Sequence, residues 1–170
     1  MDTIVSNSSP LIHLFKVGSG PVLKKMFKKV IIGPAVFNET VILGKFKGFK
    51  DAFLIESAVG DIISMVQPSD VMKKNMRRYE AMGLGPGEAE AIAIAKDKSL
   101  SVIIDETAAR SIAGSEGVRY LGSLGILLMA TRQGHMTKKL AKSTCRQLIS
   151  SGFRLTSAVL IEFEDAIDGL

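Results

Sequence analysis

The chain has 170 residues, of which 46% are hydrophobic and 23% charged, so residues 1–170 are expected to fold as a single domain and not to be disordered. No apolar run approaches the length of a membrane span, no signal-peptide pattern opens the sequence, and a lone cysteine, Cys145, excludes an internal disulfide and is typical of the cytoplasm. One cysteine and two histidines supply no zinc cluster, while the net charge of +5 fits a polyanionic partner without requiring one.

Strands and helices are predicted to alternate along the first half of the chain. Residues 4–6 form the first predicted strand, and Ser9 before Pro10 is typical of a helix start. The helix that follows carries His13, which is expected to face outward. Residues 30–32 form the second strand, after which Gly33-Pro34 opens a helix carrying Glu39. From helical spacing alone, a solvent-facing Glu39 is slightly favoured.

Three segments concentrate lysine and arginine, at residues 24–29, 45–50 and 73–78. In the second of them, Lys45-Phe46-Lys47-Gly48-Phe49-Lys50 interleaves bases with aromatic rings. Such a pattern can bind a nucleic-acid backbone and stack on its bases. It can equally be a basic loop whose two phenylalanines dock on the core. Both interpretations stay open at this point.

The stretch from Gly83 to Glu106 places acids at both ends of a predicted helix–strand unit. A glycine-rich turn precedes a helix that begins near Glu88, and residues 102–104 form a short buried strand. Asp105 follows this strand, at the end where parallel sheets bind ligands. Glu88 and Asp105 are therefore expected to converge. The simpler alternative is that Glu88 stabilises its helix through a favourable interaction with the helix dipole, and that Asp105 caps the next helix.

The remainder of the chain continues the alternation. Helices are predicted over 107–113, 123–132 and 137–149 and from residue 157 onward, with a strand over 118–121. Short β-branched strands without hairpin signals indicate an α/β fold with a mostly parallel sheet covered on both sides. Neither GxGxxG in a strand–helix turn nor GxxxxGK[ST] is present, which argues against a dinucleotide-binding or P-loop enzyme.

Six segments in order resemble the motifs of PIN-domain nucleases, in particular a prokaryotic branch related to VapC-type toxins. They are IVSNSSPLI (4–12), IIGPAVFNETV (31–41), LGPGEAEAIAIA (84–95), VIIDETAAR (102–110), LGSLGILLMA (121–130) and SGFRLTSAVL (151–160). The resemblance implies a three-layer α/β/α sandwich and a ribonuclease with Mg²⁺ or Mn²⁺ held by acids. It also allows an antitoxin-like protein partner and a homodimer.

Carried onto this sequence, the resemblance implies that Glu39, Glu88 and Asp105 are catalytic metal ligands. Glu90 and Glu106 compete with Glu88 and Asp105 for those roles. Ser9 matches the hydroxyl residue that hydrogen-bonds into the site. Metal-bound carboxylates would activate a water and neutralise the phosphate, and RNA is the expected substrate.

One position departs from the family pattern. The first acid should follow the first strand, and the chain has Asn7 there. An amide oxygen can ligate Mg²⁺ but brings no negative charge, so activity is expected to be impaired. Either the protein is a weakened or non-catalytic member, or Asn7 is an engineered change. The alternative function is a PIN-fold module that binds RNA or a protein without cutting it.

Overall fold

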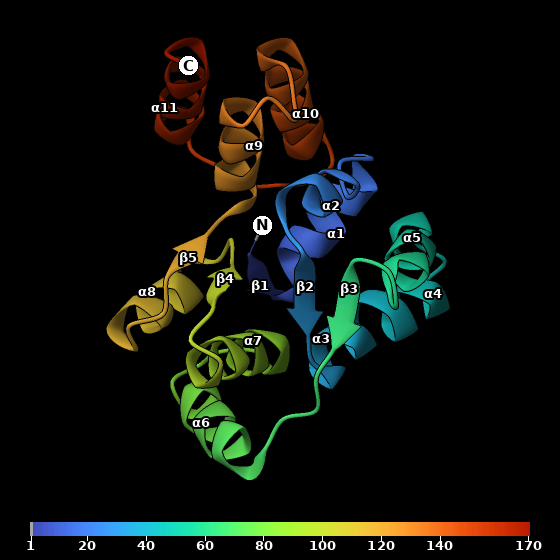
Figure 1. Cartoon of the computed structure of the whole chain (residues 1–170), viewed down its shortest axis with the longest axis vertical. Helices are drawn as coiled ribbons and strands as arrows, with labels where there is room; N and C mark the ends of the chain where they lie inside the picture. Colours follow the sequence, from blue (N-terminus) through green and yellow to red (C-terminus); the bar gives the residue numbers. More distant parts are fainter. Residues whose placement is uncertain (1) are drawn as a thin grey trace.

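A five-stranded, all-parallel sheet forms the centre of the computed structural model, which describes residues 2–170 (Figure 1). Its strands are β1 (Thr3–Ser6), β2 (Lys29–Ile32), β3 (Ile63–Met65), β4 (Ser101–Ile103) and β5 (Tyr120–Leu121). Their order across the sheet is β3-β2-β1-β4-β5. With helices packed on both faces, this arrangement confirms the expected α/β/α sandwich and its parallel sheet.

The helices are named in chain order in Figure 1. Those before β4 are α1 (Ser8–Lys16), α2 (Val22–Met26), α3 (Pro34–Phe37), η1 (Asn38–Ile42), α4 (Leu43–Phe46), α5 (Lys50–Ala58), α6 (Asp70–Ala81) and α7 (Pro86–Asp97). Those after it are α8 (Thr107–Ser115), α9 (Ser123–Arg132), α10 (Lys138–Ser150) and α11 (Ser157–Asp168). The segment η1 is a π-helix that joins α3 to α4 without a break.

Two hydrophobic cores lie on opposite faces of the sheet, as the period-2 alternation of strand side chains requires. Ile4 of β1 belongs to the core shared with α1, α2, α9, α10 and α11. Its neighbour Val5 belongs to the core formed with α6, α7 and α8. In Figure 1, α9 to α11 accordingly lie at one end of the molecule and α6 and α7 at the other.

The helix α7 is buried almost all round. From Ala89 to Ala95 every residue is at most 1% exposed, so the acidic residue within that run, Glu90, is enclosed as well. Small alanines let the helix pack against β1, β4 and α6 at once. This packing fixes the beginning of α7 relative to the carboxyl ends of the strands.

The direction of the strand order reverses between β1 and β4. β2 and β3 follow on one side of β1, whereas β4 and β5 lie on the other. The backbone N–H of Asn7 donates to the carbonyl of Ile103 at 3.2 Å and joins the ends of the two strands. In open parallel sheets, the crevice outside such a reversal is where ligands bind. Within residues 2–170, no helix combines the length and apolar character of a membrane span.

Candidate functional site

A polar cavity of about 190 Å³ opens at the carboxyl ends of β1 and β4. Four separate parts of the chain line it: the start of α1, the π-helix η1, the beginning of α7 and the residue that precedes α8. Its lining residues are Asn7, Ser8, Ser9, Glu39, Gly85, Gly87, Glu88 and Glu106. The fold therefore brings together Asn7, Ser9, Glu39 and Glu88 of the predicted set.

Asn7 and Glu106 face each other across the strand reversal. The Asn7 side chain is almost fully buried, and its Nδ2 donates to Glu106 Oε2 at 3.1 Å. Its Oδ1 is also buried and has no hydrogen-bond donor within the described part of the chain. Buried polar atoms normally have partners, so a free acceptor in a polar cavity is a candidate ligand atom. Asn7 also precedes α1 as its N-cap residue, the place that the sequence suggested for Ser9.

Two serine hydroxyls hold two of the carboxylates. Ser8 Oγ donates to Glu39 Oε2, and Ser9 Oγ donates to Glu106 Oε1. Ser9 thus bonds into the pocket. Ser8 is a residue that the sequence reasoning missed, and the signal that could have found it is the run of polar residues Asn7-Ser8-Ser9 directly after a strand.

The carboxylate of Glu39 points into the pocket. It accepts the backbone N–H of Gly87 at 3.1 Å in addition to the Ser8 hydroxyl. The slight preference for a solvent-facing side chain was wrong, because Glu39 lies in the π-helix η1, whose wider turn alters the side-chain direction that an α-helical period gives. A Cβ at Gly87 would lie 2.5 Å from Glu39 Oε2, so this approach requires glycine.

Glu88 completes the acidic wall of the pocket. Its Oε2 accepts the backbone N–H of Gly85 at 2.8 Å, which anchors the first turn of α7. Burial raises the pKa of the Glu88 carboxyl, and the negative charges of Glu106 and Glu39 raise it further, against the opposing hydrogen bond from Gly85. The three glutamates therefore act on one another electrostatically.

Glu90, the competitor of Glu88, lies outside the pocket. It is 1% exposed, and its Oε2 accepts the N–H of Val36 at 3.1 Å in the first turn of α3. A Cβ at Gly33 would lie 2.1 Å from the Glu90 carboxyl carbon. Burial raises the pKa of this carboxyl. Glu90 therefore joins α7 to the start of the helical run that carries Glu39.

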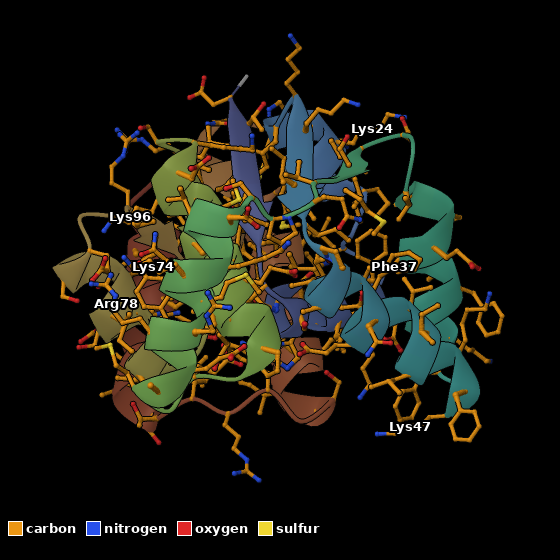
Figure 2. The ribbon with its side chains drawn as sticks, turned by 90° about the horizontal axis from the view of Figure 1, so that it is seen from below. Lys24, Phe37, Lys47, Lys74, Arg78 and Lys96 are labelled. Carbon is orange, nitrogen blue, oxygen red and sulfur yellow. The ribbon has the colours of Figure 1, made fainter. Side chains whose placement is uncertain are left out.

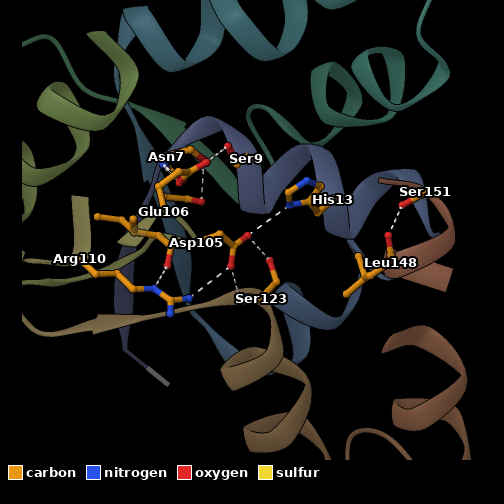
Figure 3. A network of polar contacts seen from close by, with 11 residues as sticks. Asn7, Ser9, His13, Asp105, Glu106, Arg110, Ser123, Leu148 and Ser151 are labelled. Carbon is orange, nitrogen blue, oxygen red and sulfur yellow. Dashed lines mark hydrogen bonds and ion pairs between the residues drawn. The ribbon is translucent and has the colours of Figure 1, made fainter. Parts of the chain in front are cut away.

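Asp105 also lies outside the pocket and is engaged elsewhere (Figure 3). Its carboxylate accepts the N–H of Ser123 at 2.7 Å and the Ser123 hydroxyl at 2.6 Å, and it lies 3.3 Å from His13 Nδ1. The Nη2 atom of Arg110 lies 3.7 Å from Asp105 Oδ1. The adjacent residue Glu106, and not Asp105, turns toward Asn7 and Ser9. His13 does not face outward as expected. Its ring packs edge-on against Phe153, with 4.9 Å between the two ring centroids.

The donor set matches a hard divalent cation better than zinc. Carboxylate, amide and hydroxyl oxygens are what Mg²⁺ and Mn²⁺ prefer, and the free Oδ1 of Asn7 supplies an acceptor with no other partner. Each carboxylate is at present held by serine, backbone or amide donors. Among residues 2–170, no three His, Cys, Asp or Glu side chains already stand close enough to hold an ion. Binding would therefore require side-chain rotation within the pocket.

The chain matches one family of known proteins over nearly its whole length. A family model described as a PIN domain covers residues 3–167. Among curated proteins, no match was found.

Proposed function

Because the chain belongs to the PIN-domain family, we propose that it is a metal-dependent ribonuclease whose ligands are Glu39, Glu88, Glu106 and Asn7. Family membership implies a nuclease, and PIN domains generally use divalent metals. Glu106 takes the role that the sequence assigned to Asp105. The toxin-like character expected from the sequence is part of the same proposal.

The observation that carries this proposal is the convergence of oxygen donors from four segments on one small cavity. Burial raises the pKa of Glu88 and the charges of Glu106 and Glu39 raise it further, so the carboxylates converge although their mutual repulsion is unfavourable. Carboxylates kept close together at such a cost are typical of functional sites. The buried Oδ1 of Asn7, which accepts no hydrogen bond among the described residues, is an oxygen donor of the kind that a divalent cation prefers.

The residues would divide the work as follows. Glu39, Glu88, Glu106 and Asn7 would hold Mg²⁺ or Mn²⁺, which would supply a Lewis acid for the phosphate and for an attacking water. Ser8 and Ser9 orient the Glu39 and Glu106 carboxylates, and the Gly87 N–H fixes the second oxygen of Glu39. Glu88 would supply the third carboxylate of the ligand set, with its Oε2 held by the Gly85 N–H.

The test is cleavage of a panel of single-stranded, hairpin and double-stranded RNAs with Mg²⁺ or Mn²⁺, and with EDTA as a control. Glu39→Gln and Glu106→Gln are expected to abolish cleavage and metal binding, because each removes a ligand charge. Glu162→Gln, an exposed glutamate on α11, is the matched control and should behave as the wild type. Metal-independent cleavage, or full activity in Glu106→Gln, would contradict the proposal.

A second function is supported by Asn7 itself. With an amide in place of the first acid, the pocket has one negative charge fewer. A pocket with fewer charges should bind a metal ion less tightly, which favours a non-catalytic module that binds RNA or a protein. RNA that is bound with high affinity and stays intact with both metals would establish this alternative.

A further inference from the structure

An exposed aromatic surface lies on the helix pair formed by α4 and α5. We call residues 43–58 the aromatic hairpin. Phe46 is 89% exposed, Phe49 52% and Phe53 51%. The interpretation that these phenylalanines dock on the core is therefore wrong. Large apolar side chains that gather on one surface are typical of binding sites.

The hairpin is built so that small residues meet inside and rings remain outside. A Cβ at Gly44 would lie 2.8 Å from Ala52 Cβ, so α4 and α5 approach as closely as glycine permits. Gly48, with φ at +75°, makes the tight turn between them. Asp51, Ala52 and Ile55 take the buried positions of α5. Phe46 on α4, Phe49 in the turn before α5 and Phe53 on α5 consequently stay outside the core.

Positive charge accompanies the rings. Lys45 pairs with Glu56 at 2.8 Å, and its Nζ lies 5.3 Å from the Phe53 ring centroid. Lys47 and Lys50 are exposed and have no ion pair within the described residues. Figure 2 shows Lys47 projecting from the edge of the molecule, far from Lys74 and Arg78 of α6. The hairpin therefore carries its own free cations, separate from those of α6.

We propose that the aromatic hairpin binds single-stranded RNA, with bases stacked on Phe46 and Phe49 and phosphates beside Lys47 and Lys50. Aromatic rings combined with cations are what sequence-tolerant single-strand binding requires. The aliphatic side chains beside the rings, Ile42 and Leu43, are also exposed and would suit a protein contact. The two unpaired lysines favour the polyanion. This inference rests on the proposed function, because it names the form of RNA that would reach the pocket.

The hairpin is connected directly to the pocket. Glu39 and Phe46 lie on one continuous helical run, seven residues apart, which is about 10 Å along the axis. Stacked bases rise about 3.4 Å each, so roughly three nucleotides span the interval. A strand held at Phe46 would thus extend toward the acids, and an oligonucleotide needs about four residues to contact the hairpin and the acids together.

The experiment measures binding of a fluorescein-labelled 12-nucleotide oligoadenylate by anisotropy, in EDTA so that cleavage plays no part. Phe46→Ala should weaken binding about 5- to 150-fold, and Phe46→Leu should weaken it as much, because leucine keeps the apolar area but loses the ring. Phe46→Trp should retain affinity. Tyr120→Ala removes another exposed ring, 45% exposed and on β5, and is the control.

Two further measurements complete the design. Lys47→Gln with Lys50→Gln should lower the slope of log affinity against log salt by about 0.7 for each phosphate that a lysine no longer neutralises. A fully paired duplex, whose bases are not free to stack on the rings, should bind the wild type and Phe46→Ala equally.

Three outcomes would overturn the proposal. If Phe46→Leu binds like the wild type, or Phe46→Ala loses no affinity, the stacking proposal fails. If Phe46→Ala turns a dimer into a monomer in sedimentation while RNA affinity is unchanged, the hairpin is a contact between copies and the proposal is overturned. Because binding is measured without metal, its loss or retention does not depend on whether the pocket cleaves RNA.

Discussion

At the scale of single residues, the pocket is distinguished by an amide among carboxylates. Asn7 donates one hydrogen bond to Glu106 and leaves its buried oxygen free. The Asn7 side chain is uncharged where a second carboxylate would face Glu106 at hydrogen-bond distance. The amide therefore stabilises the metal-free pocket at the expense of one ligand charge.

Asn7→Asp is expected to lower the stability of the metal-free protein and to raise its affinity for metal. In EDTA the new carboxylate would face Glu106 without a proton between them, which should lower stability by about 1–2 kcal/mol, or Tm by roughly 2–8 °C. Mn²⁺ should bind at least about tenfold more tightly and raise Tm more than in the wild type. Differential scanning fluorimetry and calorimetry measure both.

The control is the double variant Asn7→Asp with Glu106→Gln. It restores an amide–carboxylate hydrogen bond with the partners exchanged, so metal-free stability should return while the gain in metal affinity disappears. An Asn7→Asp protein that binds metal no better than the wild type would remove Asn7 from the proposed ligands.

Glu88 gives a pH dependence with a definite sign. Since its pKa is raised in the folded protein, the folded state holds a proton that the unfolded state has released, and stability falls as pH rises from 4.5 through the folded value. Glu88→Gln should flatten this part of the urea-unfolding profile and stabilise the metal-free protein at pH 7. The Gly85 N–H would still find an oxygen acceptor. Metal affinity should fall at the same time. A steeper profile in the variant would contradict this assignment.

At the scale of elements, the contact between η1 and the start of α7 determines whether the acids meet. Gly87 touches Glu39 so closely that no side chain fits between them. The sequence predicted both helices and the glycine-rich turn, but not the π-helix. An extra residue per turn depends on tertiary contacts, such as the hydrogen bond from the Gly87 N–H to Glu39, and leaves no periodic signal.

Gly87→Ala is expected to displace Glu39 while leaving the fold intact. The added methyl would lie within 3.0 Å of the whole Glu39 carboxyl group, which can move only by leaving the pocket. Mn²⁺ affinity should therefore fall about 10- to 100-fold, as it does when a group that orients a metal ligand is removed. Circular dichroism should be unchanged. Gly83→Ala on the same loop is less suitable as a control because Gly83 has a φ of +96°, so Ala89→Gly within α7 serves to measure the general cost of altering this helix.

At the scale of the whole molecule, Asp105 connects the sheet to two helices, α1 and α9, that pack on the same face of it. It joins the end of β4 to Ser123 at the start of α9 and to His13 on α1, beside the Phe153 ring that precedes α11. This residue binds the C-terminal helices to the strand end from which Glu106 enters the pocket.

Asp105→Asn is expected to reduce stability and spare the metal site. An amide can accept from only one of the two Ser123 donors and loses its charge toward His13, which should cost about 1–3 kcal/mol in the free energy of unfolding. Mn²⁺ affinity should change less than about twofold. The comparison with Glu106→Gln is decisive, since that variant should show the reverse: lost metal affinity with little loss of stability. Equal loss of metal affinity in both would restore Asp105 as a ligand.

The sheet and most helices could be predicted from the sequence because short β-branched runs such as Val30-Ile31-Ile32 alternate with helix signals. The sequence did not determine which of two nearby acids lines the pocket. Asp105 and Glu106 follow the same strand, and only the pairing of β4 with β1 and β5 determines which one faces Asn7. Glu88 and Glu90 differ by less than one helical turn, and the burial of α7 separates them.

The strand reversal also governs when the pocket can come into being as the polypeptide is made. Asn7 and Glu39 leave the ribosome early, but Glu106 cannot reach them until β4 has been synthesised and inserted beside β1, about a hundred residues later. Pairing between segments so distant along the chain is slow to form. A nascent chain therefore carries no assembled acidic pocket until β4 has emerged and paired with β1. Any activity of that pocket arises only after the stretch of message encoding the first four strands has been read.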